Sequence, residues 1–298
     1  MSHITLIEVG PRDGLQNEPT FVPTPTKINF INQLSQSGLT HIEVTSFVSP
    51  KAIQQLADNE AVFRGISKPK GVILSALIPN ERGMHRALAV GVQHIALFTA
   101  ASDTFNQHNI HCTINESFER MKPVMILARA HQIPVRAYIS CVLGCPYEGL
   151  IPPKEVLAVV LRLLALGVDE ISFGDTIGVG TPKQTKALIE LIKHHLSPAH
   201  IAMHFHDTYG QAVANTYAAL ECGITRFDSS VAGLGGCPYA QGASGNVATE
   251  DLLYLFHGLG LETGVDIYKI VAAGQAICQA MGRKNQSKVA NALLANQG

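Results

Sequence analysis

The segment Ala89-Val-Gly-Val-Gln-His-Ile95 sets the pattern that runs through this chain. Its glycine can adopt the left-handed conformation that commonly ends a helix, and the apolar residues after it are typical of a buried strand. The same order recurs at residues 36–42, 165–171 and 221–227. Each copy therefore predicts a helix, a terminal glycine and a strand that follows directly.

Four further apolar runs bring the number of expected strands to eight: residues 4–9, 71–78, 134–142 and 201–208. Helical segments separate the strands, and many begin at a capping or turn pair: Thr24-Pro25, Ser49-Pro50, Pro79-Asn80, Pro152-Pro153 and Thr181-Pro182. Eight alternating strands and helices in about 260 residues predict a TIM (β/α)8 barrel of the α/β class. A doubly wound open sheet is the alternative, but it usually has a Gly-rich nucleotide loop after its first strand, and Gly10-Pro-Arg-Asp-Gly14 is not one.

The chain is expected to form one domain, because no Ser/Pro/Gly-rich linker and no block of charge divides its 298 residues. We expect a single catalytic barrel domain over residues 1–298, with the barrel itself at about 4–263. Residues from about 264 to 298 remain after the last barrel unit, and their pattern is helical around 267–281. These additional C-terminal helices are expected to cap the barrel or to pack against a partner chain.

The composition is that of a globular protein with a large core, since 46% of the residues are apolar and 15% are charged. A net charge of −1 gives no broad positive surface for binding nucleic acid or an anionic membrane.

The longest apolar stretch, residues 156–168, contains Arg162 and is too short to span a bilayer. The first expected strand starts at Ile4, which leaves no room for a targeting peptide, so the expected compartment is cytoplasmic. Six cysteines without a CxxC pair are expected to be free thiols.

Two histidines, His204 and His206, lie two residues apart in the expected strand 201–208. Side chains of a strand alternate between faces, so the two imidazoles project to the same side, roughly 6.5 Å apart, while Phe205 faces away. Two imidazoles placed in this way can share one metal ion. Because 13 histidines make one such pair about an even chance, its neighbours must decide whether it binds metal.

Other ionisable residues are expected at the same mouth, because the carboxyl ends of all barrel strands meet there. Arg12 and Asp13 follow the first strand, Glu43 lies in the second, and Asp175 ends the sixth. Arg12 and Asp13 could instead form a local ion pair in a turn, and Asp175 could cap a helix. Glu43 inside a barrel needs a cationic or hydroxyl partner. For Asp207, a surface position and a role in orienting a histidine both remain open.

Asp13, His204 and His206 together offer one carboxylate and two imidazoles, a set that leaves coordination positions open for water or substrate. These ligands suit Mg²⁺ or Mn²⁺ more than a thiolate-rich zinc site, although zinc remains an alternative. Arg12 beside such an ion would supply a fixed positive fork for an oxyanion.

Cys237 lies in a glycine-rich stretch, residues 231–246. A loop of this composition is flexible enough to close over a site. A cysteine in a loop is more often inert than catalytic, yet its thiol can donate or accept a proton near neutral pH if a cation lies close.

Several blocks of the sequence closely resemble the 3-hydroxy-3-methylglutaryl-CoA lyases of the DRE-TIM metallolyase superfamily. The most specific blocks are VGPRDGLQNE at 9–18, EVTSFVSP at 43–50, GCPYE at 144–148, GDTIG at 174–178, HFHDTYG at 204–210, and the segment 230–250. The resemblance extends from Ile4 to Val289.

The resemblance implies a divalent cation, Mg²⁺ or Mn²⁺, held by Asp13, His204, His206 and Asn246. Arg12 would neutralise an enolate oxygen, Gln16 would help to hold the substrate, and Cys237 would transfer a proton, with His204 as a second candidate for acid or base work. Glu43, Asp175 and Glu250 would support the site.

The reaction that the resemblance implies is the cleavage of an acyl-CoA thioester, (S)-3-hydroxy-3-methylglutaryl-CoA, to acetyl-CoA and acetoacetate. This reaction belongs to leucine breakdown and ketone-body formation. The family also implies a homodimer.

Three other functions remain alternatives. One is a related lyase that acts on another 3-hydroxyacyl-CoA. Another is a synthase that condenses a 2-oxo acid with acetyl-CoA on the same scaffold; such synthases share the Arg-Asp and His-x-His pairs, but many carry a long C-terminal regulatory domain. The third is a barrel that only binds a partner, which should show a broken mouth, whereas every position named above has the expected residue type.

Overall fold

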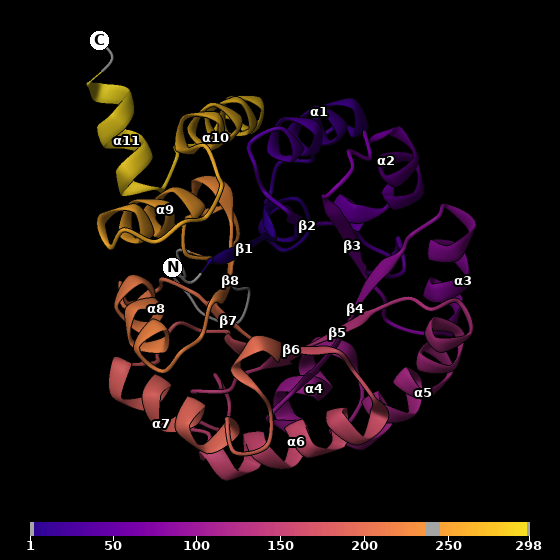
Figure 1. Ribbon diagram of the computed structural model, residues 1–298. Coiled ribbons are helices and arrows are strands. Elements are labelled where there is room, and N and C mark those ends of the chain that lie inside the picture. Colours follow the sequence, from indigo (N-terminus) through magenta and orange to yellow (C-terminus); the bar gives the residue numbers. More distant parts are fainter. Residues whose placement is uncertain (1–2, 237–244, 297–298) are drawn as a thin grey trace.

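The computed structural model describes residues 3–236 and 245–296 (Figure 1). Within these residues, parallel strands close into a barrel in the order of the sequence, and the last strand pairs with the first. The strands are β1 (Thr5–Glu8), β2 (His41–Ser46), β3 (Ile73–Leu77), β4 (His94–Ala100), β5 (Val135–Ser140), β6 (Glu170–Asp175), β7 (Ile201–Phe205) and β8 (Arg226–Ser229). The predicted TIM barrel is confirmed.

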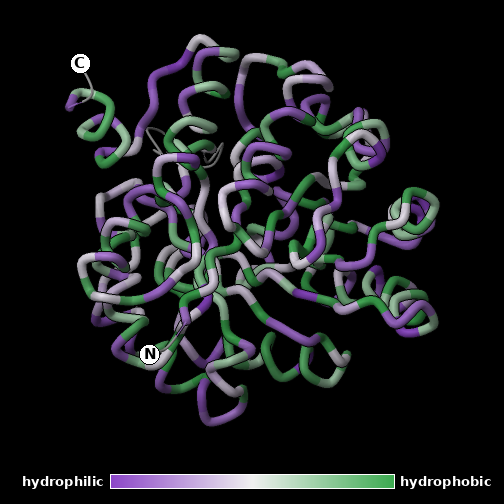
Figure 2. The backbone as a smooth tube through the Cα atoms, turned by 45° about the horizontal axis from the view of Figure 1, so that its top comes forward, coloured by the Kyte–Doolittle hydropathy of each residue, from purple (hydrophilic) through white to green (hydrophobic). Residues whose placement is uncertain are grey.

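The outer helices follow the strands and ring the barrel (Figure 1). They are α1 (Thr24–Ser35), α2 (Asn59–Gly65), α3 (Glu81–Ala89), α5 (Ile114–Ala130), α6 (Pro153–Leu166), α7 (Pro182–Ile192), α8 (Ala212–Glu221) and α9 (Thr249–Gly258). An additional helix, α4 (Asp103–Ile110), lies between β4 and α5. Figure 2 shows hydrophobic and hydrophilic segments alternating along these helices, as expected for helices that bury one side. In α6 the buried residues are Val156, Val159, Val160 and Leu163, which share that side.

The repeated glycines occupy the positions that the sequence predicts for them. Gly38, Gly91, Gly167 and Gly223 lie between a helix and the next strand, with φ between 81° and 95°. This left-handed conformation strains residues that carry a Cβ. Gly38 is also held by close packing, because an added Cβ would lie 2.1 Å from the carbonyl oxygen of Gly264.

One predicted helix start is wrong. Ser49-Pro50 does not begin a helix: the Ser49 carbonyl accepts a hydrogen bond from Ala52 N at 2.9 Å, and its hydroxyl accepts one from Lys51 N at 3.4 Å. These two bonds form a turn instead. A short 3-10 helix, η2 (Gln54–Leu56), follows, and α2 begins only at Asn59. A serine before proline therefore marks a turn here rather than a cap.

The C-terminal segment forms α10 (Ile267–Met281) and α11 (Lys288–Ala295). The helix predicted around 267–281 is confirmed. α10 packs against α1 and against the short turn η4 (Val231–Gly233), while α11 packs against α9. Among the described helices, none combines the length and the apolar character that a membrane span requires.

Candidate metal and active site

The first site residues come from a short helical turn that follows β1 directly. In this turn, η1 (Gly10–Gly14), the amides of Arg12, Asp13 and Gly14 all donate to the Val9 carbonyl, at 3.1, 2.8 and 3.1 Å. The turn is closely packed: a Cβ on Gly14 would lie 2.7 Å from Ser230 Oγ. The tight turn fixes the backbone from which Arg12 and Asp13 extend.

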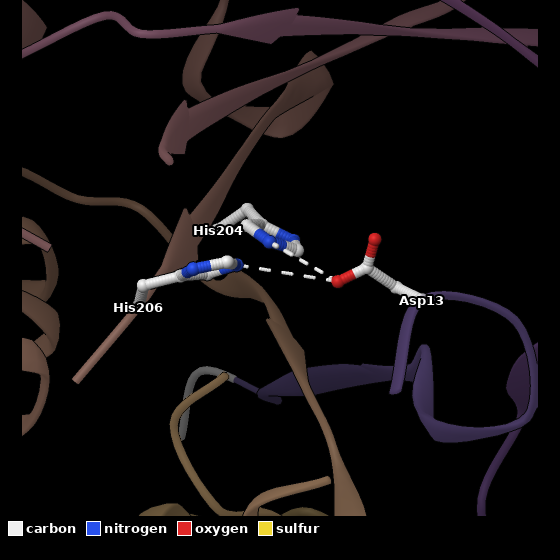
Figure 3. Close-up of side chains that lie close together, drawn as sticks. All are labelled: Asp13, His204 and His206. Carbon is white, nitrogen blue, oxygen red and sulfur yellow. Dashed lines mark ion pairs between the residues drawn. The ribbon is translucent and has the colours of Figure 1, made fainter. Parts of the chain in front are cut away.

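Asp13 lies opposite His204 of β7 and His206, which directly follows that strand (Figure 3). Nε2 of His204 and Nε2 of His206 each lie 4.0 Å from Asp13 Oδ2, and the two ring centroids are 5.3 Å apart. One ligand atom from each of the three residues lies within 4.8 Å of the others. The structure therefore brings together a carboxylate and two imidazoles that can hold one metal ion.

Asn246 contacts the same carboxylate from a position beside His206. Its backbone pairs with His206 as an isolated bridge, and its Nδ2 donates to Asp13 Oδ2 at 2.9 Å and to the Leu234 carbonyl at 3.2 Å. Rotation of the amide by about 180° around Cβ–Cγ would direct Oδ1 toward Asp13 and the histidines. Asn246 is thus placed to add an oxygen ligand when a cation neutralises Asp13.

The charges in this cluster suit a hard divalent cation. Burial alone would raise the pKa of Asp13, but Arg12 and then the two histidines hold that pKa well below its usual range. Burial, followed by the neighbouring His204, lowers the pKa of His206 to about 4. Near neutral pH the cluster therefore offers an ionised carboxylate and a neutral His206 imidazole, which are the forms that bind a metal.

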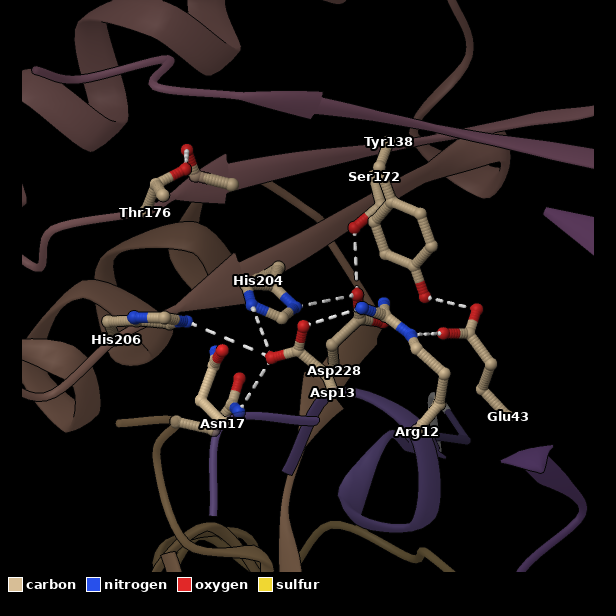
Figure 4. Close-up of polar contacts among 12 residues, drawn as sticks. Arg12, Asp13, Asn17, Glu43, Tyr138, Ser172, Thr176, His204, His206 and Asp228 are labelled. Carbon is tan, nitrogen blue, oxygen red and sulfur yellow. Dashed lines mark hydrogen bonds and ion pairs between the residues drawn. The ribbon is translucent and has the colours of Figure 1, made fainter. Parts of the chain in front are cut away.

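Arg12 is buried and held from two sides (Figure 4). Nε donates to Glu43 Oε1, and Nη1 donates to Asp13 Oδ1 at 2.5 Å. The Tyr138 hydroxyl donates to the other oxygen of Glu43 at 2.9 Å, and the guanidinium carbon lies 5.3 Å from the centre of the Tyr138 ring. Glu43 has both the cationic and the hydroxyl partner that its burial requires. In the described part of the chain, Arg12 Nη2 is not found to donate a hydrogen bond.

A second chain of contacts lies behind His204. Its Nδ1 is 3.2 Å from Asp228 Oδ2, which also accepts a hydrogen bond from Ser172 Oγ at 2.8 Å. The other oxygen of Asp228 accepts from Arg136 Nη2. Arg136 Nη1 donates to the Tyr138 hydroxyl at 3.3 Å. The guanidinium of Arg136 therefore connects the histidine half of the site with the Arg12–Glu43 half.

These interior residues were missed at the sequence level. Tyr138, Ser172 and Asp228 lie inside β5, β6 and β8 rather than after the strands, so the rule of catalytic strand ends does not select them. One signal was available. Arg136 and Tyr138 are spaced i and i+2 in an otherwise apolar strand, which places both on one face, and a polar face within an apolar strand needs partners.

Asp175 is directed at the backbone of the loop after β6. Its carboxylate accepts hydrogen bonds from Val179 N at 3.2 Å and from Gly180 N at 2.9 Å. Burial raises its pKa to about 6, although those backbone bonds and the nearby charge of His204 oppose the rise. The carboxylate thus shapes the loop, and among the described residues no hydrogen bond joins it to His204.

Two buried carboxylates hold the turn η4 that follows β8. The Ala232 amide donates to both carboxylate oxygens of Glu250, at 3.0 and 2.9 Å, and Glu8 accepts a hydrogen bond from Val231 N at 3.0 Å. Ala232 has φ of 59°, a left-handed conformation that is unusual for a residue with a Cβ. Burial raises the pKa of Glu250 to about 8 and that of Glu8 to about 7. Glu250 therefore supports the start of the segment that leads toward Asn246.

The remaining predicted residues are less closely tied to the cluster. Gln16 is half-buried just beyond η1. Asp207 accepts a hydrogen bond from Ala212 N at 3.0 Å and does not orient a histidine through any contact in the described residues. Cys237 lies outside the described residues.

Comparison with known proteins places this arrangement among enzymes. A family model described as HMGL-like matches residues 3–277. The mitochondrial hydroxymethylglutaryl-CoA lyase of Rattus norvegicus is 54% identical over 289 residues, which are 97% of this chain and 89% of the relative. A 3-hydroxy-3-isohexenylglutaryl-CoA/hydroxy-methylglutaryl-CoA lyase of Pseudomonas aeruginosa is 54% identical over 292 residues, 98% of this chain and 97% of the relative.

A solved structure gives the same result in three dimensions. An HMG-CoA lyase from Acinetobacter baumannii, in complex with coenzyme A and 3-methylmalate, superposes with a TM-score of 0.94 at 39% sequence identity. The match covers 97% of this chain and 95% of that one. The likeness thus includes the strands and the turns that carry the cluster.

Proposed function

Because the chain belongs to the HMGL-like family, we propose that it is a hydroxymethylglutaryl-CoA lyase, which cleaves (S)-3-hydroxy-3-methylglutaryl-CoA to acetyl-CoA and acetoacetate. The observation that carries this function is the group of Asp13, His204 and His206, with Arg12 bound to the carboxylate of Asp13. A metal site and a fixed cation side by side suit a reaction in which an alkoxide and an enolate both develop.

The residues that would hold the metal are Asp13, His204, His206 and Asn246. The proposed ion is Mg²⁺ or Mn²⁺, since carboxylate, amide and neutral imidazole ligands suit these ions and the group found among the described residues contains no thiolate. When bound, such an ion polarises the hydroxyl and carboxylate oxygens of a substrate and lowers the pKa of the hydroxyl. Arg12 keeps Asp13 ionised, so the carboxylate is ready to bind the ion.

Arg12 is the residue that we assign to the thioester oxygen. Glu43 and Asp13 occupy Nε and Nη1, which fixes the plane of the guanidinium and leaves Nη2 for a developing enolate oxygen. Glu43 and the Tyr138 hydroxyl thus act through Arg12 by holding it in place. We propose that Gln16, just beyond the same turn, helps to hold the substrate.

Proton transfer is assigned to Cys237, with His204 as the second candidate. Cleavage removes the proton of the tertiary hydroxyl and later delivers one to the enolate carbon, and a thiol can serve as that donor. Asp175 and Glu250 are proposed to act by shaping the loops around the site. Their hydrogen bonds to the backbone of Gly180 and Ala232 support this role.

The closest competing function is a lyase with a larger acyl-CoA substrate. The observation in its favour is the name of the Pseudomonas aeruginosa relative, which includes 3-hydroxy-3-isohexenylglutaryl-CoA. A coupled assay for acetoacetate with a panel of 3-hydroxyacyl-CoA thioesters distinguishes the two. We expect the highest kcat/KM with 3-hydroxy-3-methylglutaryl-CoA. A higher kcat/KM with the isohexenyl thioester would reverse the assignment, and cleavage of neither would reject both.

We propose a single catalytic domain, with the barrel at about 4–263 and a helical extension at about 264–298, that works as a homodimer in the cytoplasm. The packing of α10 and α11 against α1 and α9 supports the one-domain organisation. The relatives include both mitochondrial and cytoplasmic lyases, so the compartment is best tested by localising the tagged protein in cells.

A further inference from the structure

Asp228 lies on β8, is 2% exposed, and its carboxylate faces the back of a metal-site imidazole. Oδ2 is 3.2 Å from His204 Nδ1, while Nε2 of the same ring is 4.0 Å from Asp13 (Figure 4). We propose that Asp228 is a positioning residue that accepts the Nδ1–H of His204 and so fixes the tautomer whose Nε2 lone pair is directed at the metal. The inference rests on the proposed metal centre and does not depend on which substrate is cleaved.

The position of the carboxylate is fixed from two further directions. Ser172 Oγ donates to Oδ2 at 2.8 Å, and Arg136 Nη2 donates to Oδ1. Ser172 and Asp228 lie on β6 and β8, the two strands that flank β7, so the carboxylate is held next to the strand that carries His204. A carboxylate held in this way also holds the plane of the imidazole that donates to it. Hydrogen-bonded partners of this kind raise the basicity of a ligating histidine and orient its ring.

His206 provides the contrast within the same site. Its Nδ1 is buried, and no hydrogen bond to it is found in residues 3–236 and 245–296. Of the two histidines, His204 therefore has the ring whose tautomer is determined by a carboxylate. The metal affinity of the site should depend on Asp228 more than on any group behind His206.

Glu170 provides a control for the structural contribution of Asp228, because both carboxylates pair with Arg136. Besides Asp228, Arg136 pairs with Glu170, whose Oε1 lies 2.8 Å from Arg136 Nε. Glu170 also pairs with Arg226, at 2.5 Å. Replacing either carboxylate disturbs the same largely half-buried ion-pair chain, but of the two only Asp228 contacts His204. We therefore expect Glu170→Gln to disturb the ion pairs of Arg136, as Asp228→Asn does, while leaving the contact with His204 in place.

The test measures Mn²⁺ affinity without substrate, by electron paramagnetic resonance of the free ion. We expect Asp228→Asn to raise the Kd for Mn²⁺ by about 10-fold to 100-fold, because the amide can donate to Nδ1 and stabilise the wrong tautomer. Glu170→Gln should leave the Kd within about threefold of wild type. The Mn²⁺ concentration for half-maximal activity should rise in Asp228→Asn by the same factor as the Kd.

The possible outcomes distinguish a failure of the positioning role of Asp228 from a failure of the proposed metal centre. An equal Kd in wild type and Asp228→Asn, or an equal rise in both variants, overturns the positioning role. No Mn²⁺ binding by wild type rejects the metal centre itself. If Asp228→Asn does not fold by circular dichroism, Ser172→Ala carries the test: loss of one anchor of the carboxylate should raise the Kd by at least about threefold. An unchanged Kd in Ser172→Ala would then overturn the inference.

Discussion

Arg12 shows how one side chain can depend on a network that no short motif contains. It follows β1 by only a few residues, yet its orientation depends on Glu43 from β2 and, through Glu43, on Tyr138 from β5. Burial alone would lower the pKa of Arg12, but Glu43 and then Asp13 raise it above its usual value. The cation is thus permanent and held in one place.

Replacing Arg12 tests its assignment to the enolate oxygen. We expect Arg12→Gln to lower kcat by about 10²-fold to 10³-fold, since the amide keeps a hydrogen-bond donor but loses the charge that stabilises the oxyanion. Arg64→Gln is the matched control, because the Arg64 side chain is 62% exposed and lies 3.9 Å from Glu60 on a helix surface. Steady-state kinetics of both variants provides the comparison. A kcat for Arg12→Gln within about threefold of wild type would remove Arg12 from the chemistry.

At the residue scale, the sequence predicts the candidate metal ligands better than the residues that hold those ligands in place. The spacing of His204 and His206 places both imidazoles on one face of a strand, and the barrel frame places Asp13 at the same mouth. Asp228 and Ser172 occupy ordinary strand positions. Their importance arises from contacts between β6, β7 and β8, and a local pattern does not contain such contacts.

The turn η4 is the clearest case at the scale of elements. In this turn Ala232 has a left-handed conformation, and its amide donates to Glu250. Helix α10 packs closely against the same carboxylate, because a Cβ on Gly274 would lie 3.0 Å from Glu250 Oε1. Such a strained residue persists only because the surroundings fix it. Leu234 directly follows the turn, and its carbonyl accepts a hydrogen bond from Asn246 Nδ2 at 3.2 Å, so the turn contacts the metal site.

The buried carboxylate of Glu250 predicts a pH-dependent stability. Burial raises its folded-state pKa to about 8, above the ordinary value, so the folded protein binds this proton more tightly than the unfolded chain. The resulting stability is fully present below the unfolded pKa, roughly 4.3, and is lost as pH rises toward 8. Glu250→Gln cannot ionise and should not lose it. We therefore expect the Tm of Glu250→Gln minus that of wild type to become more positive between pH 5 and pH 8.

Thermal unfolding across that pH range checks this prediction. The exposed Glu155 of α6 provides the control, because Glu155→Gln should give a Tm difference that does not change with pH. A constant difference for Glu250→Gln as well would show that its proton does not contribute to stability.

The elements themselves are predicted well where the pattern is periodic. The four helix–glycine–strand units and the helix at 267–281 appear at their expected places because each has a local physical cause, a left-handed glycine or an apolar face. Helix α4 was not expected. It is short, and of its residues only Phe105 and Asn106 are buried, so it leaves little periodic signal in the sequence.

At the scale of the whole molecule, the barrel positions the site by bringing distant segments to one mouth. Asp13 and Asn246 are 233 residues apart in the chain, yet their side chains meet at 2.9 Å. Metal binding should therefore stabilise the entire fold, since the ligand set exists only when β1, β7 and the segment after β8 are assembled.

A thermal-shift measurement tests this coupling. At a Mn²⁺ concentration of about 100 times Kd, binding to the folded state alone stabilises it by about 2.7 kcal/mol, which should raise Tm by several degrees. Asp13→Asn should abolish the shift, whereas Asp103→Asn on the exposed start of α4 should retain it. A shift that persists in Asp13→Asn would place the metal elsewhere.

The most direct test of the account is acetoacetate formation by protein stripped of metal with EDTA. With 3-hydroxy-3-methylglutaryl-CoA as substrate, we predict that the stripped protein is inactive and that Mg²⁺ or Mn²⁺ restores acetoacetate formation to the level of the untreated protein. Undiminished acetoacetate formation by the stripped protein would contradict a lyase whose chemistry depends on the Asp13, His204 and His206 cluster.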